Sequence, residues 1–235
     1  MEHEEYTAET YPSFGKKYNG EKAVISLTSW KARINTVSKT LFSLIQQCPG
    51  FHIVLVLSEE EFPKMCEELP ENLMLFVENE MIELLWVYKN YKSLKKWIFT
   101  AFKYNGIPII TADDDCFYVS NYAEKLYKKF EKTKKDIITY NNTRNGKYKT
   151  IAEGQCTLFA NKDLRLPFKC FQNASKIKSY KWQDDVMYND YIKNLKQSYT
   201  YVRNDFVFPY YFHTQEGAIN KGQSNSYIKH EEYIK

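Results

Sequence analysis

Ile109-Ile110-Thr111-Ala112-Asp113-Asp114-Asp115 is an apolar strand pattern that leads directly into three carboxylates. Three adjacent like charges repel one another unless a cation or strong hydrogen-bond donors neutralise them. Ligands of open α/β sheets bind at the carboxyl ends of the strands, which is where these carboxylates are expected. The stretch therefore predicts a divalent-metal site. The alternative is a solvated acidic turn before a helix that begins near Asn121.

Length, charge and cysteine content narrow the class of protein. The chain has 235 residues, 43% of them hydrophobic, and we expect one domain with a full core. Its 33 basic and 29 acidic residues give a net charge of +4, too balanced to indicate nucleic-acid binding. Five cysteines without a C-x-x-C pair argue against zinc and against a disulfide framework.

The sequence also indicates a location. The first twenty residues lack the basic-then-apolar pattern of a secretory signal, and no stretch reaches the ~18 apolar residues of a membrane-spanning helix. We expect a cytoplasmic protein and leave peripheral contact with the inner face of the membrane open. The oligomeric state is not predicted.

Short apolar runs alternate with helical patterns between residues 23 and 140, which is typical of a mostly parallel sheet with helices on its faces. Strands are expected at residues 23–27, 53–57 and 83–87, from Ile109, and at residues 136–140. Helices are expected from Val37 to Cys48, at residues 62–69, after a cap at Ser93, and from Ala123 to Phe130.

The alternation breaks after residue 140. Asn145-Gly146 is a hairpin-turn signal, residues 148–160 favour antiparallel strand or loop, and a helix (184–195) and a strand (199–208) follow. We divide the chain into an N-terminal extension (1–20), a domain (21–212) and a C-terminal loop or tail (213–235). Within the domain, residues 21–120 form a nucleotide-binding half and residues 121–212 an acceptor half.

Four segments, taken in order, carry a resemblance to a known family: Ser26 to Ile34, Leu57 to Pro63, Lys92 to Lys96 and Thr111 to Asp115. Together they resemble bacterial glycosyltransferases of the GT-A fold, which include enzymes of surface-polysaccharide assembly. The resemblance covers residues 23–195. It implies an α/β fold of the GT-A (nucleotide-diphospho-sugar transferase-like) type, a single domain with a mostly parallel central sheet flanked by helices.

The resemblance also implies an activity of the hexosyltransferase type. The donor would be a sugar nucleotide, with a UDP-sugar as the default, and Mn²⁺ or Mg²⁺ would bind through a D-x-D motif. One sugar would pass to a hydroxyl of a glycan or of a lipid-linked saccharide acceptor. Whether the configuration of the sugar is inverted or retained stays open, and inversion is our working hypothesis.

The chemistry of such a transfer explains the carboxylates. Breaking a glycosyl-phosphate bond leaves a nucleoside diphosphate, whose developing charge a cation stabilises as a Lewis acid. Mg²⁺ and Mn²⁺ favour oxygen ligands. In an extended segment alternate side chains share a side, so Asp113 and Asp115 are the expected metal ligands and Asp114 points elsewhere. By resemblance, one aspartate of the motif also meets the ribose or the sugar, which makes Asp114 a donor-binding candidate.

The residues that follow the first strand are donor-binding candidates as well. Thr28 and Ser29 would offer backbone or hydroxyl groups to the base or ribose, and Arg33 would pair with the diphosphate. The alternative for Arg33 is an ordinary arginine in a surface loop. Ser58, at the end of the second strand, would approach the nucleoside, although a helix cap explains it equally well.

Lys92, Ser93, Lys95 and Lys96 are placed at a helix N-terminus, where backbone N–H groups favour anions. A lysine there opposes the helix dipole and is easier to explain if phosphate is its partner. We therefore assign Lys92 and Lys95 to the donor site. A solvated basic face is the alternative for Lys96.

An inverting transfer also needs a carboxylate that takes the proton of the acceptor hydroxyl. Trp182-Gln183-Asp184-Asp185-Val186 resembles the acidic pair that the family carries at the start of a late helix. We favour Asp185 as the base and keep Asp184 as the second candidate. Helical geometry separates the two side chains by about 100°, so only one of them is expected to face the site, and the sequence leaves open which one. The alternative is N-capping of the helix by Asp184.

Three further candidates come from the resemblance. Gly154 lies where the family has an acceptor loop, but here the family's glycine-rich form is reduced to this one glycine. His213 would be a third metal ligand, as a late histidine is in several GT-A enzymes. Lys221, in the segment that follows, is a diphosphate candidate. A structural role is the alternative for His213.

Three other classes of protein would require different sequence features. A nucleotidyltransferase shares the sheet and the metal carboxylates but usually needs a glycine-rich phosphate loop, and residues 26–33 contain no glycine. A phosphohydrolase of the haloacid dehalogenase type needs D-x-D-x-[T/V], and Phe117 occupies the last position. A non-catalytic carbohydrate-binding protein would account for the 17% aromatic residues by ring stacking, yet such modules are usually β-rich.

Overall fold

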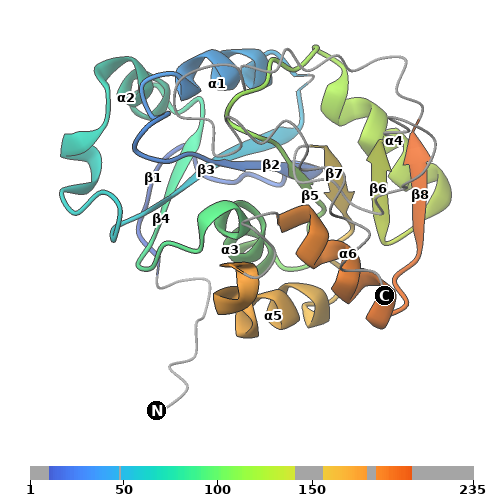
Figure 1. Cartoon of the computed structure of the whole chain (residues 1–235). Helices are drawn as coiled ribbons and strands as arrows, with labels where there is room; N and C mark the ends of the chain where they lie inside the picture. Colours follow the sequence, from blue (N-terminus) through green and yellow to red (C-terminus); the bar gives the residue numbers. More distant parts are fainter. Residues whose placement is uncertain (1–10, 48, 141–155, 179–183, 203–235) are drawn as a thin grey trace, which may run out of the picture.

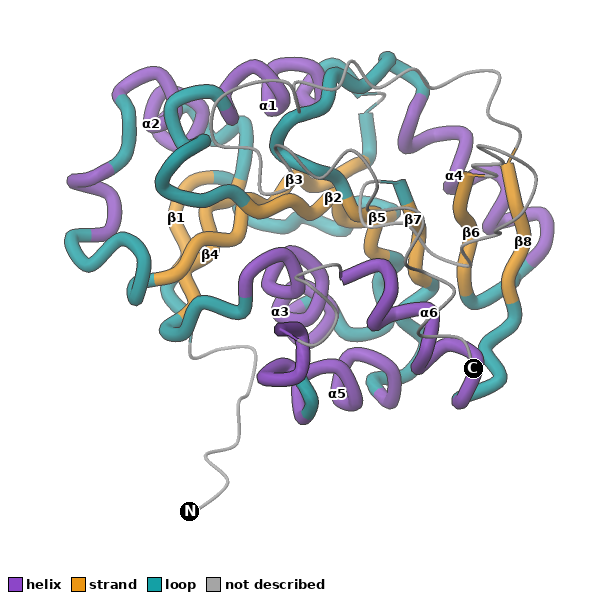
Figure 2. The backbone as a smooth tube through the Cα atoms, viewed as in Figure 1, coloured by secondary structure: helices purple, strands orange, loops and turns teal. Residues whose placement is uncertain are grey.

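The computed structural model describes residues 11–47, 49–140, 156–178 and 184–202 and shows a mixed sheet between two layers of helices (Figures 1 and 2). The strands of the sheet are β1 (Ser13–Gly15), β2 (Ala23–Thr28), β3 (Phe51–Ser58), β4 (Glu83–Val87), β5 (Ile109–Thr111), β6 (Ile137–Tyr140), β7 (Thr157–Phe159) and β8 (Tyr199–Val202). The α-helices are α1 (Val37–Ile45), α2 (Glu71–Glu78), α3 (Lys95–Lys103), α4 (Tyr122–Thr133), α5 (Arg165–Gln172) and α6 (Asp184–Asn194).

The strand order places a topological switch in the middle of the sheet. The order is β1-β4-β3-β2-β5-β7-β6-β8, and of these strands β1 and β7 run antiparallel to their neighbours. From β2 the chain moves outward through β3 to β4, then crosses back through α3 to pair β5 with the other edge of β2. The segments that leave β2 and β5 therefore diverge at the same point of the sheet, where open α/β sheets bind their ligands.

Successive side chains of the central strands point to opposite faces of the sheet and form a hydrophobic core on each face. Ile25 and Leu27 of β2 pack in one cluster with residues of α1, α2 and α4, whereas Val24 packs in the other with residues of α3, α5 and α6. Figure 1 shows the same division, with α1 and α2 above the sheet and α3, α5 and α6 below it. Every residue of β3 is buried, as expected of a strand covered on both faces.

The expected mostly parallel α/β sheet is confirmed. Residues 148–160 were expected to form antiparallel strand or loop, and β7 is an antiparallel strand within them. The expected helix at residues 62–69 is wrong. Only a 3₁₀ turn forms there (Met65–Glu68), and Leu69 is extended because the following Pro70 disfavours helical geometry in the residue before it. The α-helix of this region is α2, which begins directly after Pro70 and buries Leu73 and Val77.

The expected cap at Ser93 is also wrong. Ser93 lies inside a 3₁₀ turn (Lys92–Leu94), and α3 begins at Lys95 without a side-chain cap. Besides α2, one strand and one α-helix were not expected: β1, which lies within residues 1–20, and α5. The strand expected at residues 199–208 is described only as β8, and the proposed division into parts stays a prediction. No helix among the described residues is long and apolar enough to cross a bilayer.

A buried polar cluster ties the amino ends of β3 and β4 to α3. The Glu83 carboxylate accepts hydrogen bonds from His52 Nε2 (2.6 Å) and Lys103 Nζ (2.5 Å), and from the Tyr104 hydroxyl. Burial by itself would raise the pKa of Glu83, but these hydrogen bonds outweigh burial and lower the pKa to about 2. The folded state therefore stabilises the ionised carboxylate.

Replacing Glu83 by glutamine is expected to lower the free energy of unfolding by about 3 kcal/mol at pH 7, as the lowered pKa implies. A lowered pKa stabilises the fold fully above the ordinary value of 4.5, and this contribution is lost as the pH falls towards about 2. Urea unfolding of the wild type and of Glu83→Gln between pH 7 and pH 2.5 measures it. The two curves should converge in acid. The exposed Glu78→Gln is the control, and equal losses in both variants would contradict the role of Glu83.

Candidate active site

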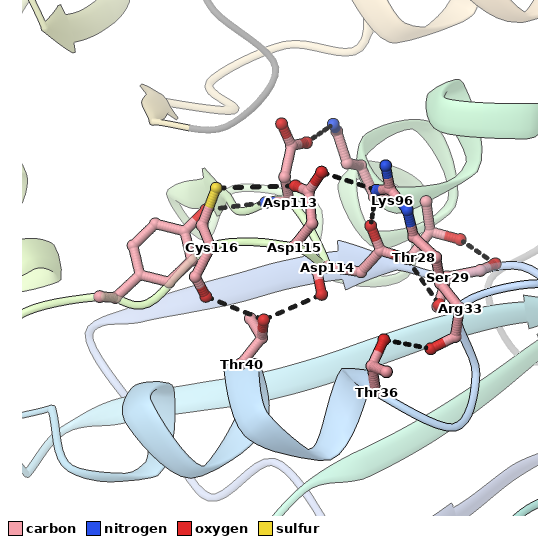
Figure 3. Close-up of polar contacts among 11 residues, drawn as sticks. Thr28, Ser29, Arg33, Thr36, Thr40, Lys96, Asp113, Asp114, Asp115 and Cys116 are labelled. Atoms are coloured by element: carbon pink, nitrogen blue, oxygen red, sulfur yellow. Dashed lines mark hydrogen bonds and ion pairs between the residues drawn. The ribbon is translucent and has the colours of Figure 1, made fainter. Parts of the chain in front are cut away.

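The segments that leave β2 and β5 bring together the sequence-predicted residues Ser29, Arg33 and Asp113 to Asp115 (Figure 3). Residues 30–36 form a tight turn in which the amides of Arg33 and Ile34 donate to the carbonyl of Trp30, so the Arg33 side chain returns towards the aspartates. These residues lie together at the topological switch, at the carboxyl ends of β2 and β5.

Asp114 is the aspartate that points into the protein. Its side chain is 8% exposed and accepts hydrogen bonds from the Ser29 hydroxyl (2.6 Å) and Arg33 Nη1 (2.7 Å). Burial raises the pKa of Asp114 more than these two donors lower it. Asp114 is more buried than Asp113 and Asp115, but it shares Arg33 Nη1 with Asp115 and does not face away from that neighbour. Its proposed contact with the donor stays a prediction.

Asp115 is held by the same guanidinium. Arg33 Nη1 lies 2.8 Å from Asp115 Oδ2, and the Cys116 thiol donates to Asp115 Oδ1 over 3.7 Å. Burial and repulsion from Asp113 raise the pKa of Asp115 to about 6, although Arg33 opposes the shift. One nitrogen of Arg33 thus pairs with two carboxylates.

Asp113 is the most accessible of the three carboxylates and has a different cationic partner. Its side chain is 35% exposed, and its Oδ1 lies 2.7 Å from Nζ of Lys96, whose own side chain is 3% exposed. The Asp113 amide donates to the Tyr118 hydroxyl (2.8 Å), which fixes the backbone at the end of the apolar segment.

A side chain of α1 holds the backbone of the aspartate segment. The Thr40 hydroxyl lies 2.9 Å from the carbonyl oxygen of Asp114 and 2.8 Å from that of Cys116. One turn further along α1, the Ser43 hydroxyl accepts a hydrogen bond from the Tyr118 amide (3.0 Å). The position of the carboxylates is therefore fixed by α1 as well as by β5.

The chemistry of this cluster fits a hard divalent cation. Ligand atoms of Asp113, Asp115 and Cys116 lie within 4.8 Å of one another. Burial raises the pKa of the Cys116 thiol. Hard cations prefer carboxylate oxygen to sulfur. The two carboxylates remain, and oxygen donors of this type suit Mg²⁺ or Mn²⁺.

The remaining donor-site candidates line the same edge of the sheet. The Thr28 hydroxyl donates to the carbonyl of Val56 (2.6 Å), and the buried Ser58 hydroxyl has no hydrogen-bond partner among the described residues. The Lys95 ammonium is buried, 3.2 Å from Asn90 Oδ1 and 3.7 Å from Glu61 Oε2. Burial lowers the pKa of Lys95 to about 8.

Other candidates are placed less completely. Lys92 is exposed, in the 3₁₀ turn before α3. Asp184 and Asp185 form the first turn of α6, as expected from the sequence, and their side chains lie outside the described part. Gly154, His213 and Lys221 lie outside the described residues.

Sequence reasoning missed Thr40 and preferred Lys95 to Lys96, for which a solvated basic face was the alternative. Thr40 is buried in α1 between the apolar positions Val37 and Leu41. A polar residue on the apolar stripe of a helix is a signal that such a side chain has a buried partner, and it was available from the sequence. Lys96 had no such signal, because its neighbour Lys95 has the same charge and only packing separates their roles.

Comparison with known proteins supports the fold. No protein-family model and no curated protein sequence matches the chain. Its structure matches S. aureus TarS 1–349 with a TM-score of 0.50 and 9% identity, over 82% of this chain and 61% of that one. The apo form of the glycosyltransferase GlyE from Streptococcus pneumoniae TIGR4 matches with a TM-score of 0.47 and 14% identity, over 78% of this chain and 45% of that one.

The TarS match confirms the expected fold class, a mostly parallel GT-A sheet flanked by helices. At this level of identity the match shows the fold alone. The chain spans about half to three fifths of the length of these two structures.

Proposed function

We propose that this chain is a metal-dependent glycosyltransferase that moves a sugar from a nucleoside-diphosphate donor, by default a UDP-sugar, to a hydroxyl. The acceptor would be a glycan or a lipid-linked saccharide in cell-surface polysaccharide assembly. One observation carries the proposal: Asp113 and Asp115 stand at the topological switch of a GT-A sheet, with Arg33 and Lys96 against them. Carboxylates and basic groups together suit an ion that binds a diphosphate.

In this proposal Asp113 and Asp115 hold the ion, which supplies Lewis-acid stabilisation of the leaving diphosphate when it is bound. Arg33 keeps Asp115 and Asp114 in place through Nη1, and its other two nitrogens form no hydrogen bond or ion pair with the described residues. These nitrogens suit the proposed contact with the diphosphate. His213 as a third ligand and Lys221 as a diphosphate contact belong to the same proposal.

For the nucleoside, the Ser58 hydroxyl is the candidate that the contacts favour. It is buried at the carboxyl end of β3, and a buried hydroxyl without a partner costs free energy until a ligand or water pairs with it. The Thr28 hydroxyl already donates to Val56, and the Ser29 hydroxyl to Asp114. These two residues therefore have only acceptor oxygens or backbone groups to offer to the base or ribose.

The acceptor base is proposed to be Asp185, with Asp184 as the second candidate. Support comes from the packing of α6 on α3: the rings of Tyr188 and Trp97 lie 5.0 Å apart, near the amino ends of the two helices. The first turn of α6 therefore lies on the side of the sheet that carries Lys96. A carboxylate there would take the proton of the attacking hydroxyl.

Calorimetry with UDP, GDP and CDP, with and without Mn²⁺, tests the proposal. One nucleotide should bind in the presence of Mn²⁺ and not in its absence. With the matching sugar nucleotide and an acceptor, Asp185→Asn should keep this binding and lose transfer. Retained transfer would move the base to Asp184. Carbohydrate binding without any nucleotide binding would contradict the proposal, and so would synthesis of a sugar nucleotide from a nucleoside triphosphate.

A further inference from the structure

The backbone of Lys96 is fixed, and its long side chain reaches Asp113. Its backbone carbonyl accepts a hydrogen bond from the Ser26 hydroxyl of β2 and another from the Thr100 hydroxyl (2.8 Å). Its side chain is buried along its length and ends 2.7 Å from Asp113 Oδ1. The strand that carries Ser26 thus sets where the Lys96 ammonium meets the aspartate.

The charges around the three aspartates explain why the Lys96 ammonium lies beside Asp113. With the carboxylates ionised, Arg33 and Lys96 leave the group with a formal charge of −1. A divalent ion would change this charge to +1, which attracts a diphosphate, whereas the group without the ion repels one. Lys96 and the ion compete for the same carboxylate oxygen atoms of Asp113, and two cations on one carboxylate repel each other.

We propose that Lys96 is a positioning residue that neutralises Asp113 before the metal ion binds and turns to the donor diphosphate when the ion takes its place. This inference rests on the proposed function, because it takes the donor to be a diphosphate. Lys96 is suited to both positions, since an ammonium at the end of four methylenes can move while its backbone stays fixed to β2. Arg33, held by two carboxylates at once, keeps the rest of the segment in place.

The inference requires opposite effects on the two ligands when the charge of Lys96 is removed. In Lys96→Gln, Mn²⁺ no longer competes with an ammonium, so its affinity in the absence of nucleotide should rise roughly tenfold. The diphosphate loses a cationic contact, so its affinity at saturating Mn²⁺ should fall roughly tenfold. A residue that only supports the fold would lower both affinities or change neither.

Mn²⁺ binding to the nucleotide-free protein is measured by electron paramagnetic resonance, and nucleotide binding at saturating Mn²⁺ by calorimetry. Lys96→Arg keeps the charge and should keep the wild-type Mn²⁺ affinity, and Lys22→Gln, which breaks a distant ion pair with Glu124, should change neither value. Lys96→Met, which keeps the apolar stem, replaces Lys96→Gln if the latter does not fold.

A Mn²⁺ affinity that falls or stays unchanged in the folded neutral variant overturns the inference, and so does a rise of the same size in Lys96→Arg. Failure of the proposed function is a separate result. In that case the wild type would bind no nucleotide at saturating Mn²⁺, while the Mn²⁺ measurement on the nucleotide-free protein would still decide the role of Lys96.

Discussion

Asp113→Asn and Asp115→Asn are each expected to lower the rate of sugar transfer about a thousandfold, which corresponds to ~4 kcal/mol of transition-state stabilisation. Asparagine keeps the shape of the side chain and one oxygen but removes the negative charge that attracts a divalent ion. Asp113 should show the effect most directly, because it is the most exposed of the three carboxylates. In both variants, binding of the nucleoside diphosphate should no longer depend on Mn²⁺.

Calorimetry with the nucleotide, at increasing concentrations of Mn²⁺, measures this loss alongside the transfer rate. Asp163→Asn is the matched control, since Asp163 pairs with the exposed Arg165 far along the chain from the aspartate segment. Nucleotide binding to Asp163→Asn should depend on Mn²⁺ as it does in the wild type. Metal-dependent nucleotide binding that survives in either Asp113→Asn or Asp115→Asn would remove the basis of the proposed function.

Arg33→Met is expected to lower the free energy of unfolding by about 4 kcal/mol at pH 8, because breaking a buried ion pair leaves a carboxylate without its cation. The cost arises mainly at Asp114, because its side chain is almost entirely buried and solvent cannot replace the guanidinium. Methionine occupies a similar volume, so the loss reports charge and hydrogen bonding rather than a cavity. Urea unfolding monitored by circular dichroism gives the value.

Two further measurements separate this cause from a general loss of packing. Asp114→Asn in the Arg33→Met background should restore a large part of the stability, because the unpaired charge is gone. The deficit of Arg33→Met should also shrink at pH 5. Asp115 already has a pKa of about 6, and a raised pKa in an acid means that protonation favours the folded state as the pH falls. A deficit below 1 kcal/mol, or no recovery in the double variant, would contradict this account.

The central sheet could be predicted from the sequence because its strands have strong patterns. Val54 and Leu55 of β3 belong to an unbroken apolar run, and the run at Glu83–Val87 is bounded by turn residues. Such patterns fix the type and position of an element. The segment around α2 lacked such patterns. Pro63 and Pro70 both permit an α-helix to begin after them, but an α-helix begins only after Pro70.

The candidate site could be predicted in part for a similar reason. Asp113, Asp115 and Arg33 follow strands whose carboxyl ends must lie together in a parallel sheet, so their approach follows from topology. The choice between Lys95 and Lys96 does not. Adjacent residues on a helix point about 100° apart, and which of them meets Asp113 depends on how α3 rotates against β2. That rotation is decided by packing over the whole helix.

The central position of β2 has a consequence for how the chain folds during its synthesis. Ser26 pairs on one side with Val54 and on the other with Thr111, and the ribosome makes Thr111 57 residues after Val54. At a rate of synthesis of about 5–20 residues per second, β5 is made roughly 3–11 s after β3. During this time the edge of β2 that pairs with β5 is uncovered. An uncovered apolar edge of this kind pairs readily with strands of other nascent chains. Production of the protein should therefore depend on chaperones that act on unfinished chains, whatever the stability of the finished fold.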